Sequence, residues 1–345
     1  MPILASLVGD REIEGLLSDE AQLRAMLRFE NALAGAEADA GLIPSEAAEA
    51  VAAAISAFQP DWDDLAKGVA RDGVVVPALI KQIRAGLPSR FQNALHKGAT
   101  SQDVIDTALI LQFAEVLPVL EARLSIILDK LAAISRLHGA EPLMAHTRMQ
   151  QALPFTWHEK LKTWSDPLGR HLVALAEARV SCLVIQLGGP IGDRSSFAGL
   201  GDAIARDLSH RLSLANASPW HAARDRIAKL GSLLSLISGS LGKIGADVAL
   251  MTQNEMSAVR LSGGGGSSAM AHKSNPISAE ILVTLARYNA GQTGLLHQAL
   301  IHENERSGAA WTLEWMTLPA IAIATGAGLH HLISLLDQLV IDSAG

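Results

Sequence analysis

The sequence predicts an all-α protein in which a bundle of long helices follows a small helical domain. Aromatic residues make up only 4% of the 345 residues, and alanine and leucine dominate; both are strong helix formers. No segment alternates apolar and polar residues over enough positions to indicate a sheet. Several apolar stretches with helical spacing are also far longer than an average globular helix of about 11–12 residues.

Residues 1–103 are predicted to form the small N-terminal helical domain. A helix is expected over 18–40, because Ser18 is a favoured N-cap and the apolar residues behind it follow helical spacing. Gly41 and Pro44 are expected to end it. Shorter helices are expected at 45–58, 61–70 and 74–86.

Residues 104–345 are predicted to form the long central bundle. The expected helices cover 106–138 with a kink at Pro118, 153–187, 222–261, 277–300 and 318–340. At 1.5 Å per residue the third of these would be roughly 55–60 Å long. Its internal glycines cost helix stability, so they predict close packing against neighbouring helices; they are Gly231, Gly239, Gly242 and Gly245.

Composition and charge restrict the partners and the compartment. The formal net charge is -7 and the pI is about 5.9, which argues against nucleic acid as a partner. The single cysteine, Cys182, is consistent with a reducing cytoplasm. The N-terminus lacks the basic segment of a signal peptide. The most apolar windows, 230–241 and 321–336, are interpreted as too short or too interrupted to span a membrane.

Two polar clusters precede long predicted helices. The first is HKGATSQDVIDT at 96–107, where Thr100, Ser101 and Asp103 are either helix caps or part of an anion site at a helix N-terminus. The second is MAHTRMQQALPFT at 144–156, which is either a solvated polar loop or a set of binding residues that includes Arg148 and Gln150.

The third cluster is GGGGSSAMAHKSNP at 263–276. Runs of glycine and serine are usually flexible linkers, yet this run ends in several polar side chains that lead into an apolar helix. The sequence contains no phosphate-binding P-loop, no nucleophile elbow and no HExxH zinc motif. No metal is therefore implied.

These three clusters, in this order, resemble the fumarase/aspartase superfamily, whose signature is G-S-S-x-M-P-x-K-x-N-P. The matching positions are Gly266, Ser267, Ser268, Met270, Lys273, Asn275 and Pro276, while Ala271 stands where proline is usual. Two further blocks, beginning PWHAARDR at 219 and HENERSGAAW at 302, are similar to those of the bacterial 3-carboxy-cis,cis-muconate cycloisomerase family.

The resemblance implies a long-helix bundle of the fumarase/aspartase type, assembled as a homotetramer whose active sites are shared between three subunits. It implies a small anionic carboxylate substrate and no cofactor. The family's third, C-terminal domain is expected to be absent or truncated here.

The resemblance also implies roles for individual residues. Ser267 would transfer the proton, and Lys273 and Asn275 would hold the carboxyl group on which charge develops. The implied substrate-binding residues are His96, Thr100, Ser101, Arg148, Gln150, Ser268, Met270 and Arg306. For His96 an ordinary polar loop histidine remains the alternative, and for Arg306 a salt bridge with Glu303. The glycines would be the hinge of a lid that carries Ser267.

Arg148 occupies the position of a histidine that protonates the leaving group in the superfamily's elimination reactions. Lactonisation needs no such acid, because the attacking carboxylate is already ionised at neutral pH. An amine leaving group, in contrast, gains roughly 10²–10⁴-fold from protonation. The sequence therefore predicts a cycloisomerase that forms a lactone from 3-carboxy-cis,cis-muconate in protocatechuate breakdown, the β-ketoadipate pathway. The alternatives are a 3-sulfomuconate cycloisomerase, a lyase of the adenylosuccinate or argininosuccinate type, and a non-catalytic helical scaffold.

Overall fold

The computed structural model describes residues 2–263, 265–266 and 274–341. Its N-terminal part is a series of helices, as the sequence predicts. They are α1 (Pro2–Val8), α2 (Arg11–Leu16), α3 (Asp19–Asp39), α4 (Ser45–Ser56), α5 (Trp62–Asp72), α6 (Val76–Ala85) and the 3-10 helix η1 (Ser89–Ala94). Ser18 caps α3, because its hydroxyl oxygen accepts a hydrogen bond from the backbone N–H of Ala21 at 3.3 Å.

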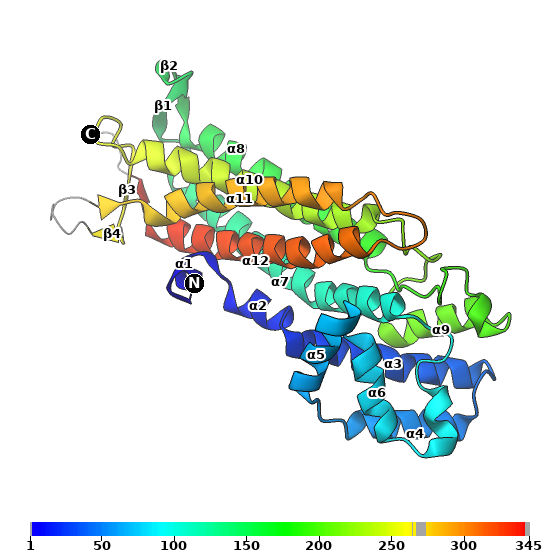
Figure 1. Cartoon of the computed structure of the whole chain (residues 1–345). Helices are drawn as coiled ribbons and strands as arrows, with labels where there is room; N and C mark the ends of the chain where they lie inside the picture. Colours follow the sequence, from blue (N-terminus) through cyan, green and yellow to red (C-terminus); the bar gives the residue numbers. More distant parts are fainter. Residues whose placement is uncertain (1, 264, 267–273, 342–345) are drawn as a thin grey trace.

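Five long helices lie side by side as a bundle (Figure 1). They are α7 (Ser101–His138), α8 (Trp157–Cys182), α10 (Asp225–Met251), α11 (Ile277–Gln298) and α12 (Gly308–Gln338). The 3-10 helix η2 (Ser195–Phe197) and α9 (Gly201–Leu212) connect α8 to α10, and α9 packs on α3. The all-α prediction is thereby confirmed.

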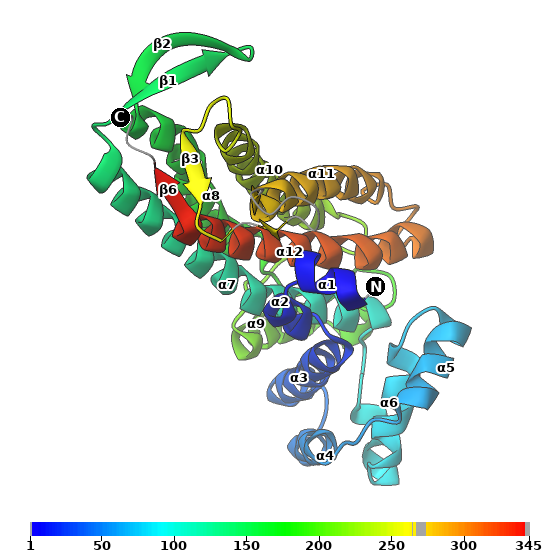
Figure 2. The ribbon, with the colours of Figure 1, turned by 90° about the vertical axis from the view of Figure 1, so that its left-hand side faces the viewer.

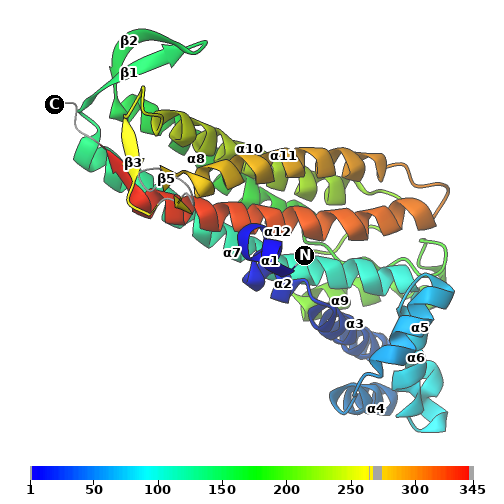
Figure 3. The same cartoon turned by 60° about the vertical axis from the view of Figure 1, so that its left-hand side comes forward.

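The division between residues 103 and 104 falls in the first turn of α7. Helices α1 and α2 lie along α12 of the bundle, while α3 to α6 gather below the start of α7 (Figure 3). The assignment of residues 1–103 to one domain stays a prediction.

Three short antiparallel strand pairs were not expected from the sequence. A hairpin of β1 (Pro142–Thr147) and β2 (Gln150–Thr156) extends from one end of the bundle (Figure 2). In addition, β3 (Val259–Leu261) pairs with β6 (Leu339–Ile341), and β4 (Gly265–Gly266) pairs with β5 (Ser274–Asn275). Each pair is too short for its alternation of apolar and polar residues to be recognised among helical patterns.

The strands also explain two helix boundaries that the sequence placed wrongly. The helix expected from 153 begins at Trp157, because the preceding residues belong to β2. The helix expected over 222–261 ends at Met251, since its last residues turn and form β3. With 27 residues, α10 is about 40 Å long.

Capping residues explain two further corrections. The predicted helix at 106 begins at Ser101, behind its N-cap Thr100. The predicted helix at 318 begins at Gly308, because the hydroxyl of Ser307 accepts a hydrogen bond from the backbone N–H of Ala310 at 3.2 Å. Both helices therefore begin earlier than the apolar pattern predicted, at the residue that follows the cap.

The predicted close packing of the α10 glycines is confirmed at three of four positions. A Cβ atom added at Gly231 would collide with Leu296 of α11, and one at Gly242 would lie 2.5 Å from the Cβ atom of Ala286. One at Gly245 would collide with a backbone carbonyl at the start of α11. At Gly239 the prediction is wrong, since an added Cβ would meet nothing within 4 Å.

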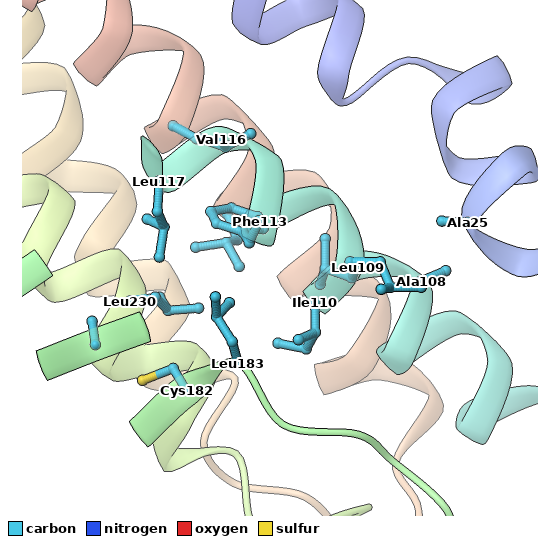
Figure 4. Packing of buried hydrophobic residues seen from close by; sticks show 14 of the residues in the cluster. Ala25, Ala108, Leu109, Ile110, Phe113, Val116, Leu117, Cys182, Leu183 and Leu230 are labelled. Carbon is cyan, nitrogen blue, oxygen red and sulfur yellow. The ribbon is translucent and has the colours of Figure 1, made fainter. Parts of the chain in front are cut away.

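The core surrounds α7 where it crosses the bundle (Figure 4). Phe113, Val116 and Leu117 of α7 are fully buried and pack in one cluster with Cys182 and Leu230. Burial of apolar surface of this kind is the main force that holds the helices together.

Two described helices, α10 and α12, are long and apolar enough to cross a membrane by length and composition. The windows at 230–241 and 321–336, interpreted from the sequence as too short or too interrupted to span a membrane, lie within these two helices. Their most apolar windows are 50% and 61% buried inside the protein, and this burial in the bundle accounts for their apolar composition.

Candidate active site

The predicted site residues lie at opposite ends of the bundle. His96, Thr100, Ser101 and Arg306 belong to the end where α7 and α12 begin, whereas Asn275 and the hairpin with Arg148 and Gln150 belong to the other (Figure 1). Helix α11 connects the two ends with 22 residues, about 33 Å of helix. Among the described residues, one chain therefore does not bring the predicted site residues together.

Several of the predicted residues lie outside the described part of the chain. They are Ser267, Ser268, Met270 and Lys273. Ser267 of the predicted lid is therefore not described, whereas three of the four predicted hinge glycines are: Gly263, Gly265 and Gly266.

The start of α7 is organised by the carboxylate of Asp103. This fully buried side chain accepts hydrogen bonds from the backbone N–H groups of Gly188 at 2.7 Å, Gly189 at 2.9 Å and Thr100 at 3.0 Å. It accepts a fourth from Nε2 of His221 at 2.8 Å. The capping alternative is thus confirmed for Thr100 and Asp103. The anion-site alternative also remains, because the N-terminus of α7 is the positive end of the helix dipole and favours an anion.

Arg306 is joined to this end of α7 through Gln102. Its Nε atom donates a hydrogen bond to Oε1 of Gln102 at 2.8 Å, and its Nη2 atom donates one to the carbonyl of Pro190 at 3.2 Å. The amide Nε2 of Gln102 in turn donates to the backbone carbonyl of His221 at 2.9 Å. Arg306 is therefore anchored to the first turn of α7, which begins at Ser101.

The alternative of a salt bridge between Arg306 and Glu303 is not what the structure shows. Within the described ranges, the hydrogen bonds of Arg306 go to Gln102 and Pro190. The hydroxyl of Ser307 interacts with Glu303 instead and lowers the pKa of that exposed carboxyl group.

His96 is not an ordinary exposed loop histidine. Its Nδ1 atom lies 2.6 Å from Oε1 of Glu30, and its side chain is only 16% exposed. Burial lowers the pKa of His96, but the charge and hydrogen bond of Glu30, together with the charge of Asp103, outweigh it and the pKa is raised. Glu30 and Asp103 therefore favour the protonated form of His96.

A buried ion cluster supports the same end of the bundle. Nη1 of Arg224 donates to Asp106 of α7 at 2.6 Å, and Nε donates to Glu314 of α12 at 2.9 Å. The indole N–H of Trp311 donates to Asp106 at 2.9 Å. These residues connect α7, the N-cap of α10 and α12 close to the polar cluster at 96–107.

At the other end, the hairpin and α10 enclose a groove of about 660 Å³. Arg148 lies at the hairpin turn in the left-handed backbone region, with φ of 50°, and lines the groove with His146 and Gln151. The sequence predicted Gln150 as a binding residue, but the residue that lines the groove is its neighbour Gln151. The two differ because successive residues of a strand point to opposite faces. The carboxylate of Asp247 in this groove pairs with Lys160 at 2.8 Å and with Lys243.

Sequence reasoning missed several residues that build the site. Gln102, His221 and Glu30 received no role, because each is defined by a contact between distant parts of the chain. The sequence signals were the position of Gln102 in the cluster HKGATSQDVIDT and that of His221 in the block that begins PWHAARDR. In the described ranges, no group of three or more histidine, cysteine or acidic side chains is arranged to hold a metal.

Sequence and structure comparisons place the chain in a family of enzymes. A family profile described as Lyase matches residues 11–290, and the chain belongs to this lyase family. The predicted resemblance to the fumarase/aspartase superfamily is thereby confirmed.

The curated relatives of the chain include a cycloisomerase and a lyase. The 3-carboxy-cis,cis-muconate cycloisomerase of Pseudomonas aeruginosa is 38% identical over 96% of this chain and 74% of its own length. The N-acetyl-S-(2-succino)cysteine lyase of Enterococcus italicus is 32% identical over 96% of this chain and 74% of its own. The crystal structure of the 3-carboxy-cis,cis-muconate lactonizing enzyme from Pseudomonas putida superposes with a TM-score of 0.93 at 34% identity, covering 99% of this chain and 78% of that one.

Proposed function

We propose that the protein is a cycloisomerase that converts 3-carboxy-cis,cis-muconate into a carboxymuconolactone in protocatechuate breakdown. The observation that carries the proposal is the 38% identity, along nearly the whole chain, to an enzyme with that activity. Arg148 supports it further, because it replaces the histidine that acts as the acid in the superfamily's elimination reactions. Lactonisation does not need that acid. No cofactor is needed for this reaction.

The reaction forms one C–O bond and one C–H bond. A carboxylate oxygen of the muconate adds to a carbon of its own double bond, and the electron pair moves to the neighbouring carbon and into the carboxyl group attached there. That carbon then receives a proton, which we assign to the hydroxyl of Ser267. Lys273 and Asn275 would hold the carboxyl group on which the charge develops.

The remaining residues bind carboxylates in this proposal. Arg148 offers a planar guanidinium that can donate two parallel hydrogen bonds to one carboxylate. Thr100, Ser101 and Arg306 lie at the N-terminus of α7, where the helix dipole also favours an anion. Gln150, Ser268 and Met270 complete the proposed set of contacts.

We further infer that the active site is shared between copies of the chain in a homotetramer. The residues around Thr100 and those around Asn275 are separated by the length of α11, about 33 Å. No single chain can therefore present both sets to one small substrate. Exposed apolar side chains on two bundle helices offer a surface for association: Val173 is 61% exposed, Val180 77% and Leu236 62%.

A second candidate function is elimination from a succinylated substrate, which the relative named N-acetyl-S-(2-succino)cysteine lyase favours. Arg148 disfavours it, since an arginine stays protonated and cannot deliver a proton to a leaving group. A 3-sulfomuconate substrate also remains open, because a sulfonate is another anion at the same position. A soluble, cytoplasmic enzyme acting on a small anion, without nucleic acid or membrane partners, fits each of these reactions.

A substrate panel tests the proposal. The purified protein is mixed with 3-carboxy-cis,cis-muconate, with 3-sulfomuconate and with adenylosuccinate, and the loss of conjugated-diene absorbance or the release of fumarate is followed. We expect fast loss of diene absorbance with the carboxymuconate. Fumarate release without any diene loss would support the lyase, and inactivity with all three compounds would support the non-catalytic scaffold.

A further inference from the structure

The pair formed by His96 and Glu30 has a role that neither residue type reveals alone. Glu30 lies on α3, its side chain is fully buried, and its Oε1 atom is 2.6 Å from Nδ1 of His96. A carboxylate oxygen this close to Nδ1 accepts the proton that Nδ1 carries. Nε2 is therefore the ring nitrogen left to meet a ligand at the start of α7.

The backbone at His96 adopts an uncommon conformation. Its φ of 59° lies in the left-handed region, which is uncommon for a residue other than glycine. His96 stands four positions before the N-cap Thr100. The imidazole is thus held between α3 and the helix end to which we assign carboxylate binding.

The charges around His96 come from three helices. Glu30 of α3 and Asp103 of α7 favour the protonated ring, while burial and Arg84 of α6 oppose it. The oxygen Oε2 of Glu30 is buried without a hydrogen-bond partner among the described residues, so the contact with His96 is the specific interaction of this carboxyl group.

We propose that Glu30 is a positioning residue for the reaction: it keeps His96 in the imidazolium form so that the Nε2–H group of His96 binds a substrate carboxylate. The inference rests on the proposed function and deepens it. It extends the site to a residue of the N-terminal helices, 66 positions from His96 in the sequence. Hydrogen bonds that involve a charged group are about twice as strong as neutral ones, so the protonated ring would strengthen the binding of a substrate carboxylate.

The substitution Glu30→Gln separates this role from a structural one. Glutamine has nearly the same shape but no charge, so only burial, Arg84 and Asp103 would remain to set the pKa of His96. The pKa of His96 would then fall, because Glu30 is the first cause that raises it. We expect KM for 3-carboxy-cis,cis-muconate to rise about tenfold or more at pH 8, with kcat within about twofold of wild type.

The same variant should recover at low pH, because His96 regains its proton there. We expect its KM to approach the wild-type value as the pH is lowered, and to rise again as the pH is raised. An equal increase in KM at every pH would indicate a structural role and overturn the proposal, as would an unchanged KM at pH 8.

Two further variants control for the substitution itself. Glu37→Gln changes another buried glutamate of α3, whose pKa is raised to about 9, so it removes no charge at neutral pH and should leave the pH dependence of KM unchanged. Glu30→Asp keeps the charge and should hold KM near wild type at pH 8. If Glu30→Asp behaved like Glu30→Gln, charge would not be the cause.

A substrate-free measurement makes the inference independent of the proposed reaction. The ring resonances of His96 are followed by NMR against pH in the wild type and in Glu30→Gln, and are assigned with His96→Asn. We expect the titration midpoint of His96 to fall in Glu30→Gln. An unchanged midpoint would overturn the inference even in an active enzyme, whereas a wild type inactive on the muconate would overturn only the proposed reaction.

Discussion

The Nε2 atom of His221 lies 2.8 Å from the Oδ1 atom of Asp103, although 118 residues separate the two in the sequence. Both side chains are buried. The contact ties the first turn of α7 to the segment that precedes α10. Asp103 also accepts hydrogen bonds from three backbone N–H groups, so this one carboxylate orders the helix end at which Arg306 contacts Gln102.

Asp103→Ala should destabilise the protein, because it removes the common acceptor of four hydrogen-bond donors. An unsatisfied buried donor costs about 1–3 kcal/mol, so the free energy of unfolding should fall by about 3 kcal/mol or more in urea titrations. Asp193→Ala is the matched control, since Asp193 accepts from Ser195 on the surface. Equal stability of the two variants would contradict the assignment.

Glu37→Gln should alter how stability depends on pH. Burial, reinforced by the charge of Glu30, raises the pKa of Glu37 from 4.5 to about 9. Between these values the folded protein holds a proton that the unfolded chain releases, so the contribution of Glu37 to stability falls as the pH rises. As the pH rises, the free energy of unfolding of the variant should increase relative to that of the wild type, by up to about 1.4 kcal/mol per pH unit.

The control for this pH effect is Glu46→Gln, which changes an exposed glutamate of α4. Urea titrations at several pH values between about 5 and 8 measure both variants against wild type. The account of Glu37 fails if the stability difference between Glu37→Gln and wild type is the same at each pH.

Ser267→Ala should remove most of the turnover and leave the fold intact. We assign the proton transfer to this hydroxyl, and a positioned acid or base contributes roughly 10²–10⁴-fold. The measurement is kcat with 3-carboxy-cis,cis-muconate, together with a circular dichroism spectrum and a thermal unfolding curve. Near-wild-type kcat in this variant would require another proton donor.

Mixing two inactive variants tests whether the site is shared between copies. Arg306→Ala and Asn275→Ala change opposite ends of the bundle. Each should be inactive alone. After the subunits have been exchanged in equal amounts, about a quarter of the sites in a mixed homo-oligomer should carry both native residues. Activity that stays at the level of the separate variants would mean that one chain supplies both residues.

The helices followed from the sequence wherever a cap and a helical apolar pattern agreed. Ser18 marked the start of α3 correctly. Thr100 and Ser307 are caps of the same kind. Polar residues after Thr100 obscured the first turn of α7, and the start of α12 was expected beside Pro319 instead of at Gly308. The hairpin of Arg148 was missed because its strands are short and its pairing is a contact between segments, which no local pattern encodes.

The candidate site could be predicted only in part, for a physical reason. Residues carried by motifs, such as Arg148 and Asn275, were found by resemblance. Glu30, Gln102 and His221 act through tertiary contacts with residues of other elements. Their roles follow from distances that only the folded chain defines.

The most direct test of the central claim is the reaction with 3-carboxy-cis,cis-muconate in D₂O, with no cofactor or metal added, followed by NMR. Lactonisation forms one C–O bond and one new C–H bond from a solvent-derived proton. We predict a carboxymuconolactone that carries a single deuterium at the carbon next to the new C–O bond. Persistence of the unreacted muconate at enzyme concentrations comparable to the substrate would contradict the account.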